Sequence, residues 1–578
     1  MPTHATTTPP PLRDRRAFLQ YFSCIGLGST LLPGVLWAKV SAGAEITAAT
    51  IAAAEEVAGV KFDDAERAMM VESLKSQEAL LEALHKVSLP NEVPPALVFD
   101  PRPPAPARSA TRAKGAKGPA VRTSAVPRRA AVPSDLEALA FLPVTELAAL
   151  VKARRVSSLA LTEMYLARLR KYDPLLKCVV TLTEERALKQ ARAADAEIRA
   201  GRYRGPLHGI PWGAKDLFAV AGYPTTWGTA PYKDQMIAED AEVVKRLDAA
   251  GAVLVAKLTL GELAMGDVWF GGMTRNPWKP EQGSSGSSAG PASATAAGLV
   301  AFALGTETLG SISSPSTRCG TTGLRPTFGR VPRTGAMALS WSMDKAGPLC
   351  RSVEDCALVL DAIRGADGRD PAAVDAPYAF DAGRTLRSLR VGYVKSAFER
   401  DEKDYPNKAF DAASLDVLRS LGAKLTPVEL PDLPYAPMRV ILLAEGAAAF
   451  DELTRSGRDK EMAAQEKGSW PNTFRTARFI PAVDYVNANR LRSIAIREWG
   501  KLMADYDVLV TPTEFKELVA TNLTGHPAVI LPNGFRPDGT PVSLTFLGKI
   551  DGEGAMLEAA NAYQRATGWN KRVPTLKV

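Results

Sequence analysis

Two serines and one lysine are the side chains best placed to do chemistry in this chain of 578 residues. Ser287 lies in the stretch GSSAG, and Ser311 follows 24 positions later in GTETLGSI. Small residues permit tight turns, which can aim hydroxyls and backbone N–H groups at one point. Lys215 lies upstream in HGIPWGAKD, a mostly uncharged stretch in which an isolated cation is costly. These residue types predict a serine nucleophile that is activated by a lysine.

The lysine matters because a serine hydroxyl is a poor nucleophile until a base accepts its proton. Histidine is the usual base, but two of the four histidines, His4 and His85, precede the part of the chain that holds the serines. We expect His208 to pack or to form hydrogen bonds beside the lysine segment. Burial can lower the pKa of a lysine, in extreme cases by about 3–5 units. We therefore expect Lys215 to be buried and largely neutral.

At these residues the chain resembles the amidase signature family, whose members use a Ser–cis-Ser–Lys triad within a glycine- and serine-rich segment. Ser311 matches the nucleophile, Ser287 the bridging cis-serine and Lys215 the base. The resemblance extends from about residue 144 to about residue 568. It includes three further blocks in the same order, GLRPTFGRV at 323–331, YDVLVTPT at 506–513 and GHPA at 525–528.

The resemblance implies an amidase that forms a seryl acyl-enzyme and releases a carboxylic acid together with ammonia or an amine. Lys215 would accept a proton from Ser287, which would accept one from Ser311. The same comparison places the oxyanion hole at the backbone N–H groups of Thr308, Leu309, Gly310 and Ser311. It implies no organic cofactor and no metal, and the cysteine and histidine spacing does not suggest zinc. The expected partner is a small-molecule amide, and the sequence leaves open whether the chain forms a homodimer.

Three positions near the nucleophile differ from the common family pattern. Leu309 replaces a glycine, which is acceptable only if its φ is negative. Ser313 stands where an arginine often follows the nucleophile, and Glu307 replaces the commoner aspartate. We expect these differences to affect contacts on the substrate side rather than the triad.

A competing motif overlaps the serine-rich segment. The stretch GSSAG also fits a Gly-x-Ser-x-Gly nucleophile elbow centred on Ser288, but that motif needs a preceding strand. Pro277 and Pro280 exclude a central strand at that place. Two alternative functions remain open: the glutaminase (A-type) subunit of an aminoacyl-tRNA amidotransferase, and a non-catalytic binding protein on an amidase scaffold.

The N-terminal region indicates export. Arg15 and Arg16 fit a twin-arginine pattern, and the apolar stretch 21–38 that follows is broken by glycines and a proline. We therefore predict a signal peptide at residues 1–44 and a periplasmic or extracellular location. No later segment reaches the roughly 20 apolar residues of a spanning helix, so stable membrane insertion is not expected. We expect the remaining four cysteines to be unpaired.

Composition divides the rest of the chain. The net charge is +8, and residues 101–133 alone contain eight basic residues and no acidic one. The excess of positive charge therefore lies in one segment, and the sequence does not predict a nucleic-acid partner. We predict a small helical segment at 45–100, a basic linker rich in proline and alanine at 101–133, and a catalytic domain at 134–578.

Hydrophobic periodicity predicts helices at 51–59, 64–86, 147–172, 184–200, 238–249, 288–298 and 353–363. Apolar runs predict strands at 252–257, 299–304, 391–394, 508–511, 528–531 and 542–547. This alternation indicates an α/β fold, and the resemblance implies one large mixed β-sheet wrapped by helices on both faces. Within 404–492, six residues are expected either to line a pocket or to pack in the core: Glu445, Phe450, Trp470, Phe474, Phe479 and Tyr485.

Overall fold

The computed structural model describes residues 45–90, 93, 95–97, 121–126, 132–401, 403 and 405–577. The predicted signal peptide and most of the predicted linker lie outside the described residues. In the part of the linker that is described, β1 (Val121–Arg122) pairs in parallel with β12 (Phe380–Asp381). Ser124 donates a hydrogen bond to Glu354 over 2.7 Å. This part of the segment therefore lies against the body of the protein.

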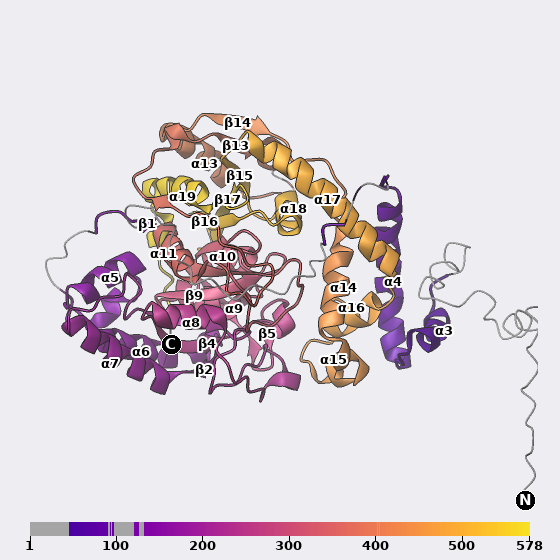
Figure 1. Cartoon of the computed structure of the whole chain (residues 1–578), viewed down its shortest axis with the longest axis horizontal. Coiled ribbons are helices and arrows are strands. Elements are labelled where there is room, and N and C mark those ends of the chain that lie inside the picture. Colours follow the sequence, from indigo (N-terminus) through magenta and orange to yellow (C-terminus); the bar gives the residue numbers. More distant parts are fainter. Residues whose placement is uncertain are drawn as a thin grey trace, which may run out of the picture.

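One mixed sheet of eleven strands forms the centre of the molecule (Figure 1). Strand β3 (Pro211–Lys215), the third from one edge, runs parallel to both neighbours, β4 (Val253–Leu258) and β9 (Phe302–Glu307). Beyond β9 the strands are antiparallel until β15, after which they are parallel again. The remaining strands are β2 (Val179–Leu182), β10 (Thr322–Arg325), β11 (Lys345–Cys350), β13 (Val391–Val394), β14 (Leu425–Val428), β15 (Val508–Pro512), β16 (Ala528–Phe535) and β17 (Pro541–Gly548). The predicted α/β fold with one large mixed sheet is confirmed.

Helices surround this sheet (Figure 1). Their bounds are α5 (Val144–Lys152), α6 (Ser158–Leu176), α7 (Glu184–Arg199), α8 (Glu242–Ala249), α9 (Ala289–Ala296), α10 (Ser313–Cys319), α11 (Val353–Ile363), α13 (Lys408–Ser420), α18 (Lys516–Thr524) and α19 (Glu553–Thr567). Helix α9 consists of small residues, and all eight of them are buried. A Cβ atom at Gly290 would lie 2.4 Å from the backbone nitrogen of Thr259, so this close packing requires glycine.

Several elements differ from their predicted bounds: α8 begins at Glu242 rather than at 238, and β16 continues to Phe535 rather than ending at 531. The helix predicted at 147–172 is divided into α5 and α6, because Arg154 adopts a positive φ of 57° and Ser157 caps α6 by accepting a hydrogen bond from Ala160. The strand predicted at 299–304 begins later, at Phe302, and continues to Glu307. An apolar run indicates that residues are buried but does not show that they form a strand. Residues 299–301 are buried, but they lie in the turn that leads into the strand.

The N-terminal helices are α3 (Ala48–Ala58) and α4 (Asp64–His85), close to the predicted ranges. Asp63 caps α4 by accepting a hydrogen bond from the backbone of Glu66. Helix α4 lies beside α16 (Trp470–Ala477) and α17 (Ala482–Ala504), which in turn pack against α14 (Val440–Ala449) (Figure 1). An ion pair between Glu66 and Arg475 (2.9 Å) and a hydrogen bond between His85 and Asp484 (2.7 Å) join α4 to α16 and α17.

The described cysteines, Cys178, Cys319, Cys350 and Cys356, are all buried and free, as expected. Cys356 occupies a core position of α11, as its place in the apolar pattern predicts. Among the helices of the described part of the chain, none combines the length and the apolar character that crossing a bilayer requires.

Candidate active site

Lys215 is the last residue of β3, and it is buried where the sequence predicts. Its Nζ donates hydrogen bonds to three hydroxyl groups: Ser287 Oγ at 2.8 Å, Thr306 Oγ1 at 2.9 Å and Ser288 Oγ at 3.1 Å. Burial lowers the pKa of Lys215 to about 7, although the negative charges of Asp344 and Glu307 act in the opposite direction. A neutral amine is therefore available near neutral pH.

The segment that carries Ser287 is held against the nucleophile loop by its neighbour Ser288. The peptide bond between Gly286 and Ser287 is cis, which agrees with the cis-serine that the family comparison implies. The backbone N–H of Ser288 donates to the carbonyl of Ser311 over 3.0 Å. The hydroxyl of Ser288 donates to the carbonyl of Thr306 over 3.1 Å. Ser288 thus joins the lysine, the serine segment and β9.

Ser311 lies in the turn between β9 and α10. Gly310 makes this turn with a φ of 87°, which suits glycine, whereas the φ of Leu309 is not positive, as its side chain requires. Within the described residues, the backbone N–H groups of Leu309, Gly310 and Ser311 donate to no acceptor, and the Ser311 hydroxyl has no hydrogen-bond partner. A free hydroxyl and free N–H groups therefore meet at one turn, the combination that a tetrahedral oxyanion needs.

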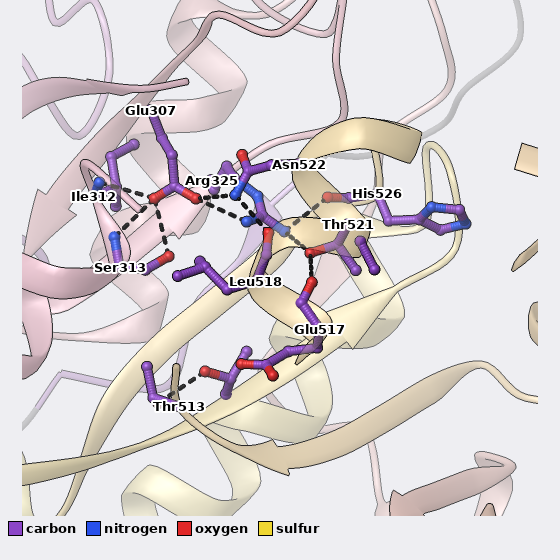
Figure 2. A network of polar contacts seen from close by, with 12 residues as sticks. Glu307, Ile312, Ser313, Arg325, Thr513, Glu517, Leu518, Thr521, Asn522 and His526 are labelled. Atoms are coloured by element: carbon purple, nitrogen blue, oxygen red, sulfur yellow. Dashed lines mark hydrogen bonds and ion pairs between the residues drawn. The ribbon is translucent and has the colours of Figure 1, made fainter. Parts of the chain in front are cut away.

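The buried carboxylate of Glu307 accepts hydrogen bonds from the residues that directly follow Ser311 and so fixes this turn (Figure 2). Oε2 of Glu307 accepts hydrogen bonds from the backbone N–H of Ile312 and of Ser313, each over 2.8 Å, and from the Ser313 hydroxyl over 2.9 Å. Oε1 accepts from Arg325 over 2.7 Å and from Asn522 over 2.8 Å. Glu307 and Ser313 both depart from the common family pattern, and the structure shows that they contact each other.

The charge of Glu307 is retained in the interior. Burial acts to raise the pKa of this carboxyl, but the Arg325 guanidinium, together with Asn522 and Lys345, outweighs burial and lowers the pKa to about 2. Arg325 in turn donates to Thr521 Oγ1 and to the carbonyl of His526, so the network extends into and just beyond α18 (Figure 2). The nucleophile turn is thus tied to β10 and α18 by charged hydrogen bonds.

Other polar residues near the site have structural positions. Asp216 pairs with Lys257 at 2.6 Å, and the ring of His208 accepts a hydrogen bond from the backbone of Arg204. Arg318 is exposed on α10. The residues before GSSAG form β7 (Arg275–Asn276) and β8 (Lys279–Gly283), a separate two-stranded sheet, which excludes the nucleophile-elbow interpretation.

A cavity of about 1090 Å³ opens beside the site. Of the six residues considered within 404–492, Glu445 and Tyr485 line this cavity, whereas the other four pack in the core: Phe450, Trp470, Phe474 and Phe479. No local pattern in the sequence identifies Asp344, which also lines the cavity and accepts a hydrogen bond from Thr308 over 2.6 Å. Within the described residues, no group of histidine, cysteine, aspartate and glutamate is arranged to hold a metal ion.

Comparisons with known proteins agree with this geometry. The family model described as Amidase matches residues 160–520. The A-type subunit of the glutamyl-tRNA(Gln) amidotransferase of Methylococcus capsulatus is 34% identical over 478 residues, which cover 75% of this chain and 98% of that protein.

Solved structures extend the likeness to three dimensions. The native peptide amidase of Stenotrophomonas maltophilia is 32% identical with a TM-score of 0.67, covering 75% of this chain and 99% of that one. An amidase family protein of Bacillus anthracis is 27% identical with a TM-score of 0.67, covering 75% and 92%. This chain therefore belongs to the amidase signature family and is an amide-hydrolysing enzyme.

Proposed function

We propose that this enzyme hydrolyses the C–N bond of a small carboxamide through a seryl acyl-enzyme on Ser311. One observation carries the proposal: the fully buried amine of Lys215, with a pKa of about 7, lies 2.8 Å from the hydroxyl of Ser287. A lysine acts as a base only in its neutral form, and the apolar interior supplies that form without a histidine.

In the proposed reaction the neutral Lys215 accepts the proton of Ser287 while Ser287 takes the proton of Ser311. The Ser311 oxygen adds to the amide carbonyl, and Ser287 then returns a proton to the leaving nitrogen as the C–N bond breaks. Water, activated by the same relay, hydrolyses the ester. The sum is one amide and one water converted into one carboxylic acid and one amine or ammonia.

The turn before Ser311 supplies the electrostatic part of this mechanism. We assign the oxyanion hole to the backbone N–H groups of Thr308, Leu309, Gly310 and Ser311. Its support is that Leu309, Gly310 and Ser311 have N–H groups with no acceptor among the described residues. Removing one such donor typically lowers the rate by about 10²–10³. The hydrogen bonds by which Glu307 fixes this turn are therefore as important for the reaction as the proton relay.

A second candidate is the glutaminase subunit of an aminoacyl-tRNA amidotransferase, which the 34% identity to a protein of that kind favours. That function requires partner subunits and cytosolic tRNA, whereas we propose that the twin-arginine pattern at Arg15 and Arg16 directs this chain to the periplasm or the exterior of the cell. Cell fractionation distinguishes the two locations, since the glutaminase function requires the cytosol.

The test of the proposed function uses the purified mature protein with a fluorophosphonate probe and a panel of primary amides, anilides, short peptide amides and glutamine. Ser311→Ala should remove both labelling and turnover, and Ser287→Ala should lower turnover by several orders of magnitude. Ser316→Ala is the matched control, because its hydroxyl is buried on α10 without a hydrogen-bond partner. Wild-type turnover in Ser311→Ala would reject the proposal.

A further inference from the structure

The cavity beside the site has features that bear on the substrate. Thr306 and Thr308 line it, whereas Ser311, three residues beyond Thr308, does not. A substrate carbonyl at Ser311 would therefore leave the rest of the molecule free to extend past Thr308 into the cavity. The volume of about 1090 Å³ matches the upper range of pockets that hold drug-sized ligands.

Part of the wall is apolar and open to solvent. Of the eleven large apolar side chains that are exposed among the described residues, four line this one cavity: Leu97 (43% exposed), Trp341 (52%), Ile496 (40%) and Ile550 (48%). They come from four separate segments of the chain. Single exposed apolar residues are ordinary, but a group of them around one hollow marks a binding surface.

The charged residues of the cavity are already engaged within the protein. Their partners are Asp370 for Arg333, Glu239 for Arg369, Ser342 for Arg492, Tyr485 for Glu445 and Thr308 for Asp344. Lys345, which also lines the cavity, is the exception: its Nζ is buried and has no hydrogen-bond partner among the described residues, and burial lowers its pKa well below the ordinary value, which favours the uncharged amine. The surface therefore favours an uncharged, apolar group over a carboxylate or an ammonium group.

Trp341 is held rigidly on both sides. The next residue toward the N-terminus, Ser340, donates its backbone N–H to Asp344 over 3.0 Å, and the backbone N–H of Ser342 donates to Glu445 over 3.0 Å. The carbonyl of Trp341 itself accepts from Arg333 over 2.6 Å. A fixed backbone with an exposed indole is a preorganised platform, because binding then costs little ordering of the protein.

Leu97 comes from the N-terminal segment, before residue 160 where the family match begins. Arg490 of α17 fixes this segment, since its guanidinium donates to the carbonyls of Val93 over 3.0 Å and of Leu89 over 2.9 Å. The backbone N–H of Ala96 donates to the carbonyl of Asn489 over 3.1 Å. The segment thus adds a wall to the cavity from outside the matched family region.

We propose that the substrate is an amide with an apolar or aromatic group that binds on the surface formed by Leu97, Trp341, Ile496 and Ile550, and that Leu97 makes the N-terminal segment a determinant of specificity. The inference rests on the proposed function, because it places the group that continues from a carbonyl held at Ser311. Recognition comes from burial of apolar area, which grows with the size of the group.

The test measures kcat/KM of the full mature chain for two series, primary amides from acetamide to hexanamide and phenylacetamide, and acetamides with the same groups on nitrogen. In at least one series kcat/KM should rise by more than tenfold from the smallest to the largest member. Leu97→Asp should reduce this ratio at least fivefold, and Trp341→Ala should reduce it further. Val486→Asp is the matched control on α17, since Val486 is 44% exposed and does not line the cavity.

The outcomes separate the two proposals. The inference would be overturned if kcat/KM did not change with the size of the apolar group in either series, or if Leu97→Asp and Trp341→Ala left the ratio of kcat/KM unchanged. In either case turnover and probe labelling of the wild type would still support the proposed function. Absence of labelling and of turnover in the wild type would overturn the proposed function and this inference with it. Thermal unfolding of each variant shows that it is folded, which is expected because both side chains are exposed.

Discussion

The carboxylate of Glu307 and the guanidinium of Arg325 lie 2.7 Å apart in the interior, and neither is open to solvent. Glu307 also accepts hydrogen bonds from the backbone N–H groups of Ile312 and Ser313, which lie at the start of α10 immediately after Ser311 (Figure 2). The ion pair therefore does more than neutralise two charges, because it fixes where the nucleophile turn ends.

Breaking this pair should be costly for stability. Arg325→Met leaves the Glu307 carboxylate buried without its cation, and the free energy of unfolding should fall by about 3–5 kcal/mol. Removing both charges in Glu307→Gln with Arg325→Met should cost less than the sum of the two single changes. Urea unfolding of the three variants measures this coupling, and strictly additive losses would show that the two residues act independently.

The pH dependence of kcat/KM should follow Lys215. The neutral amine is the active form and its pKa is lowered to about 7, so kcat/KM should rise about tenfold per pH unit below pH 7 and level off above it. Titration of the free enzyme with a neutral primary amide is the measurement, since such a substrate does not titrate in this range. A rate that is independent of pH between 5 and 8 would contradict the role of Lys215 as base.

The same burial of Lys215 destabilises the folded state. Its pKa falls from 10.5 to about 7 on folding, so the unfolded chain binds more protons between these values and stability should rise as pH increases through this window. Below pH 7 the penalty is complete and amounts to about 5 kcal/mol. Three hydrogen bonds of the amine, worth about 1 kcal/mol each, offset it in part.

Lys215→Met should therefore unfold at a higher temperature than the wild type at pH 6 while losing its activity. The gain should be on the order of 2 kcal/mol at pH 6 and should become a loss of about 2 kcal/mol at pH 10, where the penalty has fallen to about 1 kcal/mol but the three hydrogen bonds are still lost. Calorimetry at the two pH values is the measurement. A variant that is less stable than the wild type at pH 6 would mean that the lysine is not desolvated as its burial implies.

The sequence predicts the parts of this molecule that depend on local pattern. The strand 391–394 and the helix 353–363 have the predicted bounds, because in each the apolar residues follow the expected period and the pattern has clear ends. The division of the helix predicted at 147–172 depends on the positive φ of Arg154, and an arginine at this position does not predict a positive φ.

The site is predictable to the same extent. The resemblance to the amidase signature family, with its blocks in order, predicts Lys215, Ser287 and Ser311 as the site residues. The mostly uncharged stretch around the lysine predicts its burial, which the structure shows. The contribution of Leu97 and Trp341 to one cavity does not follow, because the two residues are far apart in sequence and line the same cavity only in the folded chain. Tertiary packing decides such contacts.

The turn before the nucleophile gives a last prediction, in which geometry rather than chemistry is changed. Gly310 has a φ of 87°, and a Cβ atom there would lie 3.2 Å from Ser314 Oγ and 3.5 Å from a methyl group of Leu518. Gly310→Ala should therefore displace the free N–H groups of the turn, lowering kcat by about 10–10³ with little change in KM, at a cost of about 1–2 kcal/mol in stability. Gly500→Ala is the control, because Gly500 lies within α17 with nothing near its Cβ position; it should leave activity unchanged and add about 0.5–1 kcal/mol. Steady-state kinetics and urea unfolding of both variants provide the comparison, and equal kcat values for Gly310→Ala and Gly500→Ala would show that the conformation of this turn does not govern the reaction.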